Sequence, residues 1–195
     1  MKKFLIGIVI LFLVWKFFSS ESKADWDGQL SPSEPVQASD NFPLPWTKDK
    51  YTFTPMANYH IKAVVLSKHH YWAIDSGDEL APYDLALGWG PMSDAKVINQ
   101  LKITQDGRWY NYYWKNPPPI APGEIAHHSA NTHIIASDRD ILKEVKSIKR
   151  FDVVDLEGYL VNISREDGWH WQSSLSRDDT GCEVFWVNKI EVQAH

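Results

Sequence analysis

Alternating apolar and polar positions dominate the chain after residue 51, which is the pattern of half-buried β-strands. The alternation predicts strands over residues 59–66, 109–114, 153–163 and 184–192, and residues 70–74 continue the first of these as one bent strand or a hairpin. In the third strand, the apolar phase shifts by one residue across Gly158, so we expect a glycine bulge there.

Two Asp-Gly pairs predict tight turns within this β-rich pattern. Asp106-Gly107 leads into the aromatic strand 109–114, and Asp167-Gly168 leads into Trp169 and Trp171. Asp-Gly favours the two-residue turns that join antiparallel strands, because both central residues need a positive φ. The two segments therefore predict two hairpins.

Two short segments carry helical signals instead. Ser93 is a candidate N-cap for a helix that ends near Leu101, and Ser137 with Asp140 is a candidate capping box for a helix over residues 138–148. The apolar residues of the second helix share one face: Ile141, Leu142, Val145 and Ile148. The predicted fold class is α+β, a small, bent antiparallel β-sheet or partly open β-barrel of OB-like or SH3-like character with two short helices.

The first 20 residues have the pattern of a membrane segment. Twelve uninterrupted apolar residues run from Phe4 to Trp15 behind Lys2 and Lys3, which places the N-terminus in the cytoplasm and the rest of the chain outside it. Aromatic residues after the run favour an uncleaved signal-anchor. The alternative is a signal peptide cleaved after Ala24, because twelve apolar residues are fewer than the roughly 20 that span a bilayer.

The chain divides into three parts by composition. Residues 1–20 are the signal-anchor or signal peptide, and residues 21–50 are rich in Pro, Ser and Asp without a sustained period, which predicts a linker. Phe42, Leu44 and Trp46 alternate and could hold the end of this linker against the domain, but surface aromatics beside prolines are the plainer interpretation. Residues 51–195 form the globular β-rich domain, since 195 residues leave room for one ordinary core.

Composition and charge limit the classes of molecule that this chain can bind. The formal net charge is −5, and an acidic body repels phosphate backbones, so we expect no nucleic acid partner. The single Cys182 excludes an intrachain disulfide. The aromatic share of 13% suits barrel cores and wet binding grooves equally.

Histidines are the first candidates for chemistry. His127, His128 and His133 lie within seven residues, and three imidazoles could bind zinc if the chain turned back on itself. Their spacing does not match the helical H-E-x-x-H pattern, so surface or hydrogen-bonded histidines are the plainer interpretation. We expect no metal and no cofactor.

Nucleophilic catalysis has one candidate, Cys182 with His170 as its base. A single Cys at the start of a barrel strand is more often a small buried apolar residue. The serines offer no alternative nucleophile, because no G-x-S-x-G elbow precedes a helix. The sequence therefore predicts no catalytic residues.

A polar loop over residues 173–181, SSLSRDDTG, is the better candidate for recognition, because hydroxyls, a guanidinium and carboxylates on one loop can orient a polar ligand. The alternative is a long hairpin loop whose charges pair with each other. Together with the polar start of residues 129–135, the loop gives the predicted binding residues: Ser129, Asn131, His133, Ser174, Arg177 and Asp178.

Three stretches, DLALGWGPMSD, SANTHIIAS and SSLSRDDTGCE, together with the N-terminal membrane segment, resemble a group of bacterial envelope proteins with no assigned activity. The resemblance covers most of residues 59–192. It implies an inner-membrane location with the domain in the periplasm, and it carries over no catalytic residue.

The sequence thus predicts a non-catalytic, membrane-tethered binding or assembly module of the bacterial envelope. Its expected partner is an envelope protein or a polar polymer. Residues 1–20 are expected to bind the inner membrane as well. Two alternatives stay open: an envelope hydrolase that uses the His127, His128 and His133 region, and a structural subunit of a membrane complex.

Overall fold

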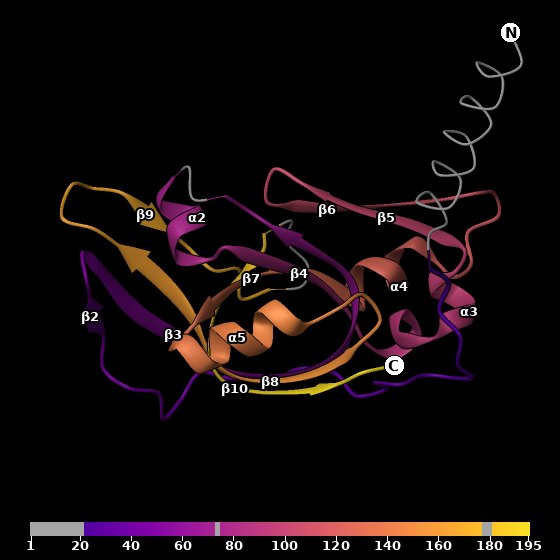
Figure 1. Cartoon of the computed structure of the whole chain (residues 1–195), viewed down its shortest axis with the longest axis horizontal. Helices are drawn as coiled ribbons and strands as arrows, with labels where there is room; N and C mark the ends of the chain where they lie inside the picture. The colour runs from indigo at the N-terminus through magenta and orange to yellow at the C-terminus, as the bar shows by residue number, and fades with distance from the viewer. Residues whose placement is uncertain (1–21, 73–74, 177–180) are drawn as a thin grey trace, which may run out of the picture.

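A computed structural model describes residues 22–72, 75–176 and 181–195. Strands are the predominant regular structure of this part of the chain, as Figure 1 shows. The main sheet contains β1 (Val36–Ala38), β2 (Trp46–Lys48), β3 (Tyr51–His70), β4 (Tyr83–Gly88), β7 (Ser129–Ala136), β8 (Val153–Ser164), β9 (His170–Trp171) and β10 (Glu183–Gln193). A separate two-stranded sheet contains β5 (Leu101–Asp106) and β6 (Trp109–Trp114).

The strand β3 organises the main sheet, because its two halves pair with different neighbours. Residues 52–64 pair with β8, and residues 64–70 pair with β4. From β4 the pairing continues to β7, β10 and β8 in turn. The β7–β10 pairing is parallel, so the expectation of a purely antiparallel sheet is wrong: the sheet is mixed.

In residues 22–72, 75–176 and 181–195, four short α-helices and one 3-10 helix connect the strands, where we expected two helices. They are α2 (Ser76–Leu80), the 3-10 helix η1 (Gly90–Ser93), α3 (Ala95–Ile98), α4 (Pro122–His127) and α5 (Arg139–Ser147). The expected helices correspond to α3 and α5, but Asp94 and Asp138 cap them rather than Ser93 and Ser137. An Asp side chain one residue later accepts the free N–H groups equally well.

The core follows the predicted alternation. One cluster lies among the inward residues of β3, β4, β7, β8 and β10, including Leu85, Leu156 and Phe185, and α5 packs Val145 and Ile148 against it. In Figure 1, α5 lies across the front of β8 and β10. A second cluster joins the β5–β6 hairpin to α3 and α4. The apolar stripe on α5 is therefore confirmed.

Gly158 has a different role from the expected bulge. The strand β8 runs unbroken through it, and the register shift lies opposite, on β10 between Val187 and Lys189. A Cβ at position 158 would lie 2.0 Å from the carbonyl oxygen of Trp186. Glycine is thus needed for the close approach of β10.

The expected linker, residues 21–50, contributes to the domain. β1 and β2 both pair with β3, and the buried Ser31 accepts a hydrogen bond from the Gly90 N–H at 2.7 Å. Of the three alternating residues, Trp46 stacks on Phe53, with ring centroids 5.6 Å apart, whereas Leu44 is 86% exposed. Within the described residues no helix is both long and apolar enough to cross a bilayer, and the expected membrane segment lies outside them.

Candidate functional site

The candidate site lies on the outer face of β4, β7 and β10, opposite the main core. Alternation along β4 turns Leu85 and Leu87 toward the core and Asp84 outward. On β7, Asn131 and His133 also face outward, beside Cys182, which directly precedes β10. This outer face is covered rather than open to solvent, because Asp84, Asn131 and His133 are all at most 3% exposed.

The cover is the tip of the β5–β6 hairpin, which Figure 1 shows beside β4. The register pairs Asp106 with Trp109, so Gly107 and Arg108 form the two-residue turn. Both have positive φ, 57° and 70°, as a two-residue hairpin turn requires. The predicted hairpin is present, but its turn is Gly107-Arg108 and not Asp106-Gly107, because Asp106 pairs within β5. The Arg108 N–H donates to the Tyr71 hydroxyl at 3.0 Å, which fixes the tip.

Arg108 and Asp84 form the centre of a buried polar network. One Asp84 oxygen accepts from an Arg108 nitrogen at 2.8 Å and from His133 Nδ1 at 2.9 Å. The second oxygen accepts from Asn131 Nδ2 at 3.3 Å. The other guanidinium branch pairs with Asp78 of α2 at 2.5 Å. The network thereby joins α2, β4, β7 and the hairpin.

Because a carboxylate only accepts hydrogen bonds, His133 donates through Nδ1. The His133 ring lies 4.8 Å from that of Trp171 on β9. Burial, assisted by the negative charge of Asp84, raises the pKa of Tyr71 to about 12. At neutral pH, Tyr71 is therefore a neutral hydroxyl that accepts from the hairpin tip.

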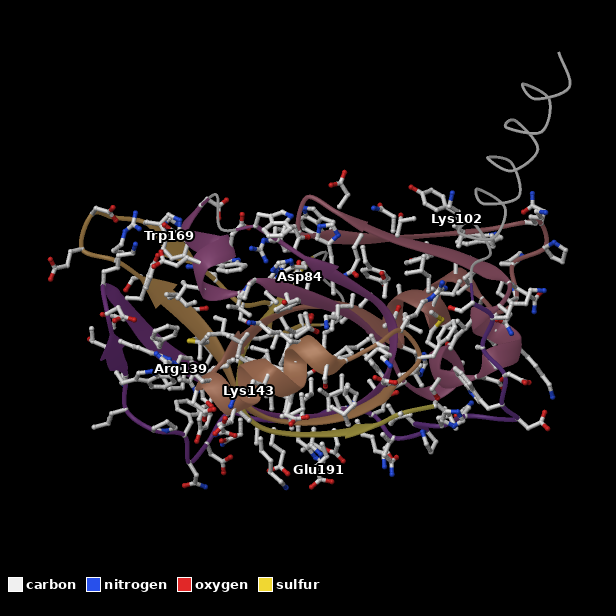
Figure 2. The ribbon with its side chains drawn as sticks, viewed as in Figure 1. Asp84, Lys102, Arg139, Lys143, Trp169 and Glu191 are labelled. Carbon is white, nitrogen blue, oxygen red and sulfur yellow. The ribbon has the colours of Figure 1, made fainter. Side chains whose placement is uncertain are left out.

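Two pockets open beside this network. The larger, the α2 pocket, has a volume of about 630 Å³. Its lining residues are Asp75, Ser76, Gly77, Arg108, Trp109, His133, Trp169, His170, Trp171, Gln172, Gly181 and Cys182. Figure 2 labels Trp169 near β9 and Asp84 beside β4, on the two sides of this region.

The smaller, the α4 pocket, has a volume of about 250 Å³. It is lined by Trp89, Trp109, Tyr110, Tyr112, Ala126, Ser129, Ala130, Asn131, Ser176, Gly181, Cys182 and Glu183. Trp109, Gly181 and Cys182 belong to both pockets. We call the two pockets together the aromatic groove.

Ser129 is fixed within the α4 pocket by two hydroxyl contacts. Its single proton goes to the Ile125 carbonyl, so the Tyr110 hydroxyl donates to Ser129 Oγ at 2.7 Å. Burial raises the pKa of Tyr110 to about 12, although the hydrogen bond to Ser129 opposes the shift.

The predicted binding residues divide between inside and outside the groove. Ser129 and Asn131 line the α4 pocket, and His133 lines the α2 pocket. Ser174 lies at the base of its loop, where its N–H donates to the Cys182 carbonyl at 2.9 Å and its hydroxyl to the Ser176 carbonyl at 2.8 Å. Arg177 and Asp178 lie outside the described residues.

The histidine cluster does not assemble as a zinc site. His128 contacts the carboxylates of Glu34 and Glu124, while His133 contacts Asp84. Within the described ranges, the group of potential ligands with all ligand atoms within 4.8 Å is a different one, His60, Asp155 and Glu157, on the outer faces of β3 and β8.

Cys182 is held by the network. Its Sγ lies 3.6 Å from the Arg108 carbonyl oxygen, to which the thiol donates, and 3.9 Å from Asn131 Nδ2. The half-buried thiol and the exposed His170 both line the α2 pocket. The sulfur thus contacts the hairpin and β7.

Sequence reasoning missed Asp84, Arg108 and the α2 residues. One signal was present for Asp84, which interrupts the apolar run from Tyr83 to Gly88, because an acid inside a buried strand needs a partner. Arg108 gave no comparable signal.

No family model, curated protein or solved structure matches the chain.

Proposed function

We propose that the domain is a non-catalytic binding module that holds a polar polymer in the aromatic groove. The main support is the position of the α2 pocket in the strand order. Five strands pair in the order β3, β4, β7, β10 and β8, and we interpret them as an OB-like, partly open barrel. OB-folds bind their ligands on strands two and three and on the loops between strands one and two and between strands four and five.

The α2 pocket uses the same places. Asp75 to Gly77 come from the connection between β3 and β4, His133 comes from β7, and Trp169 to Gln172 come from the connection between β8 and β10. This agreement is an argument from fold, and the lining chemistry supports it independently. Aromatic walls with a few polar groups are typical of sites for polar ligands with flat, partly apolar faces.

Oligonucleotides, the other common ligands of OB-folds, do not fit the charge of this chain. The net charge is −5, and nucleic acid binding depends on neutralising phosphates with Lys and Arg. Of the described residues that line the α2 pocket, one is an arginine, Arg108, and it already contacts Asp78 and Asp84. Within this part of the chain, a phosphate chain in the pocket would meet no guanidinium that lacks a carboxylate partner.

The test is electrophoresis of the full-length chain in native gels cast with soluble polymers. The detergent should have a polyoxyethylene head group, because a sugar head group could occupy the groove. A neutral glycan, an anionic glycan and poly-γ-glutamate form the panel. We expect at least one to retard the wild type, and His170→Ala with Gln172→Ala to abolish the retardation.

Trp72→Ala is the matched control, because Trp72 is 76% exposed but does not line the groove. Equal retardation of wild type and the double variant would contradict the assignment of the groove. If no polymer retards the chain while cross-linking in cells joins it to a protein through the same residues, a protein partner replaces the polymer.

We also propose that the domain lies on the periplasmic side of the inner membrane, held by residues 1–20, as the basic start and apolar run indicate. Protease added to spheroplasts should digest the domain of the intact protein. Protection of the domain until the membrane is dissolved would place it in the cytoplasm instead.

A hydrolase is the second candidate, and the Asp84–His133 hydrogen bond favours it. A buried carboxylate that holds Nδ1 leaves Nε2 as the atom through which an imidazole acts as a general base. Polymers that retard the chain should then be shortened on incubation with it, and His133→Gln should prevent shortening without preventing binding. An unchanged polymer length excludes this candidate.

A further inference from the structure

The aromatic groove is longer than one pocket. The α2 and α4 pockets share Trp109 from the hairpin and Gly181 and Cys182 from the start of β10. Two pockets that share three lining residues are adjacent, and Trp109 lies at the boundary of both. A ligand that extends across Trp109 would therefore reach both pockets.

Trp109 is the exposed aromatic surface at this junction. Its side chain is 52% exposed, although it lines both pockets. Trp171, by contrast, packs against the His133 ring and lies 5.5 Å from the Arg108 guanidinium. An exposed indole between two polar pockets offers a flat apolar face on which the ring of a ligand can stack.

The charges around the groove are predominantly negative. Among the described residues, Arg108 is the single guanidinium that lines it, whereas Asp75 and Glu183 line it and Asp78 and Asp84 lie directly behind Arg108. These described side chains present one positive charge against four carboxylates. Such a surface repels anionic ligands.

The rim does not reverse this balance. Arg165 reaches the edge of the α2 pocket, where it donates to Ser76 Oγ at 2.7 Å. The same guanidinium pairs with Asp167 at 2.6 Å, so its charge is compensated. His170 and Gln172, both exposed, add groups that hydrogen-bond to hydroxyls.

We infer that the ligand is an uncharged carbohydrate chain long enough to occupy both pockets, with one sugar ring stacked on Trp109. A sugar combines an apolar ring face with hydroxyls that donate to carboxylates, and it carries no charge for the groove to repel. This inference rests on the proposed function, and it adds the class of polymer, its charge and its minimum extent.

Isothermal titration of the full-length chain with neutral β-1,4-linked oligosaccharides, the di- and tetramers of glucose and of N-acetylglucosamine, tests it. Galacturonate tetramer is the charged counterpart. We expect at least one neutral tetramer to bind at least tenfold more tightly than its dimer, because only the tetramer reaches both pockets. The galacturonate tetramer should bind at least tenfold more weakly.

Two variants and one control test where the oligosaccharide binds. Trp109→Ala should weaken tetramer binding at least tenfold, while Tyr113→Ala should not change it, because Tyr113 is equally exposed on the same strand but lines neither pocket. Ala126→Phe fills the α4 pocket from an exposed position on α4. It should reduce tetramer affinity to that of the dimer and leave dimer affinity unchanged.

The outcomes separate this inference from the proposed function. If only the galacturonate tetramer binds, or only peptide polymers bind, the inference of an uncharged carbohydrate ligand is overturned. The proposal of a polymer-binding module then remains. Equal affinity for dimer and tetramer overturns the inference that one oligosaccharide occupies both pockets. Absence of binding to every oligosaccharide and of retardation by every polymer overturns both proposals.

Discussion

Two clusters of charged residues on the same sheet differ in almost every physical respect. Asp84 and His133 lie on the outer face of β4 and β7, where Arg108 reaches them from the tip of the covering hairpin, and Asp84 is completely buried. His60 and Asp155 lie on β3 and β8, where their side chains are 48% and 31% exposed. Figure 2 shows the same contrast between Asp84, inside the ribbon, and Glu191, on its outside.

The second cluster is a cross-strand ladder. His60 lies opposite Glu157 in the register, Lys62 lies opposite Asp155, and Lys189 pairs with Glu157 at 2.6 Å. Each carboxylate has a cation beside it and water around it, so each pair contributes little to stability. The buried network, in contrast, depends on every partner, because a buried charge without one is costly. The difference teaches that burial, not residue type, decides which cluster organises the fold.

The largest expected effect comes from removing the cation of the buried network. Arg108→Ala should lower the free energy of unfolding by about 3–5 kcal/mol, because Asp84 stays buried without its counter-charge. Urea unfolding followed by tryptophan fluorescence measures it. Arg108→Lys keeps the charge without the fork and should lose less. A loss below about 1 kcal/mol for Arg108→Ala would remove the basis of the comparison.

His133→Leu tests a weaker contact of the same network. The change removes one hydrogen bond to Asp84 but leaves those from Arg108 and Asn131, so we expect a loss of about 1–3 kcal/mol. The fluorescence of Trp171, which packs on His133, should change as well. A variant as stable as the wild type would show that Asp84 is satisfied without the imidazole.

The dependence of folding stability on alkaline pH should distinguish the half-buried Tyr110 from the exposed Tyr113 on the same strand. Burial raises the pKa of Tyr110 to about 12, above its usual value of about 10. Between these values the unfolded chain loses the proton and the folded chain keeps it. This contribution to stability is therefore complete below pH 10 and is lost as the pH rises through 12.

Tyr110→Phe should lose about 0.5–1.5 kcal/mol at pH 8, with the hydrogen bond to Ser129, but should fall less steeply than the wild type from pH 10 to 11.5. Tyr113→Phe, at an exposed position, should follow the wild-type profile. Parallel profiles for the wild type and Tyr110→Phe would contradict the raised pKa.

The smallest effect is expected in the exposed ladder. His60→Ala should leave the urea midpoint within experimental error of the wild type, and 1 M NaCl should remove any remaining difference, because salt screens exposed pairs. A clear, salt-resistant destabilisation would mean that the ladder behaves like the buried network.

Local pattern predicted α5, β6, β8, β10 and part of β3, because burial repeats with the period of each of these elements. It also found Ser129, Asn131 and His133, which stand together in one polar-apolar segment. It missed Arg108, because the hairpin turn that delivers this side chain to Asp84 joins positions 24 residues apart.

Two further differences have physical reasons. The parallel β7–β10 pairing joins strands separated by α5 and β8, and no turn residue marks such a connection. β1 and β2 have three residues each, too few to show a period. Residues 21–50 therefore resembled a linker although part of this segment pairs with β3.

The pairing of β3 with β8 also governs how the chain reaches its native state. Residues near 52–64 must find residues near 153–164, about a hundred positions later. Contacts so distant in sequence require a large loop to close before any stabilisation is gained, which slows folding. During synthesis, the groove therefore cannot form until β10, the last strand, has emerged, and a chain truncated before residue 183 should lack it altogether.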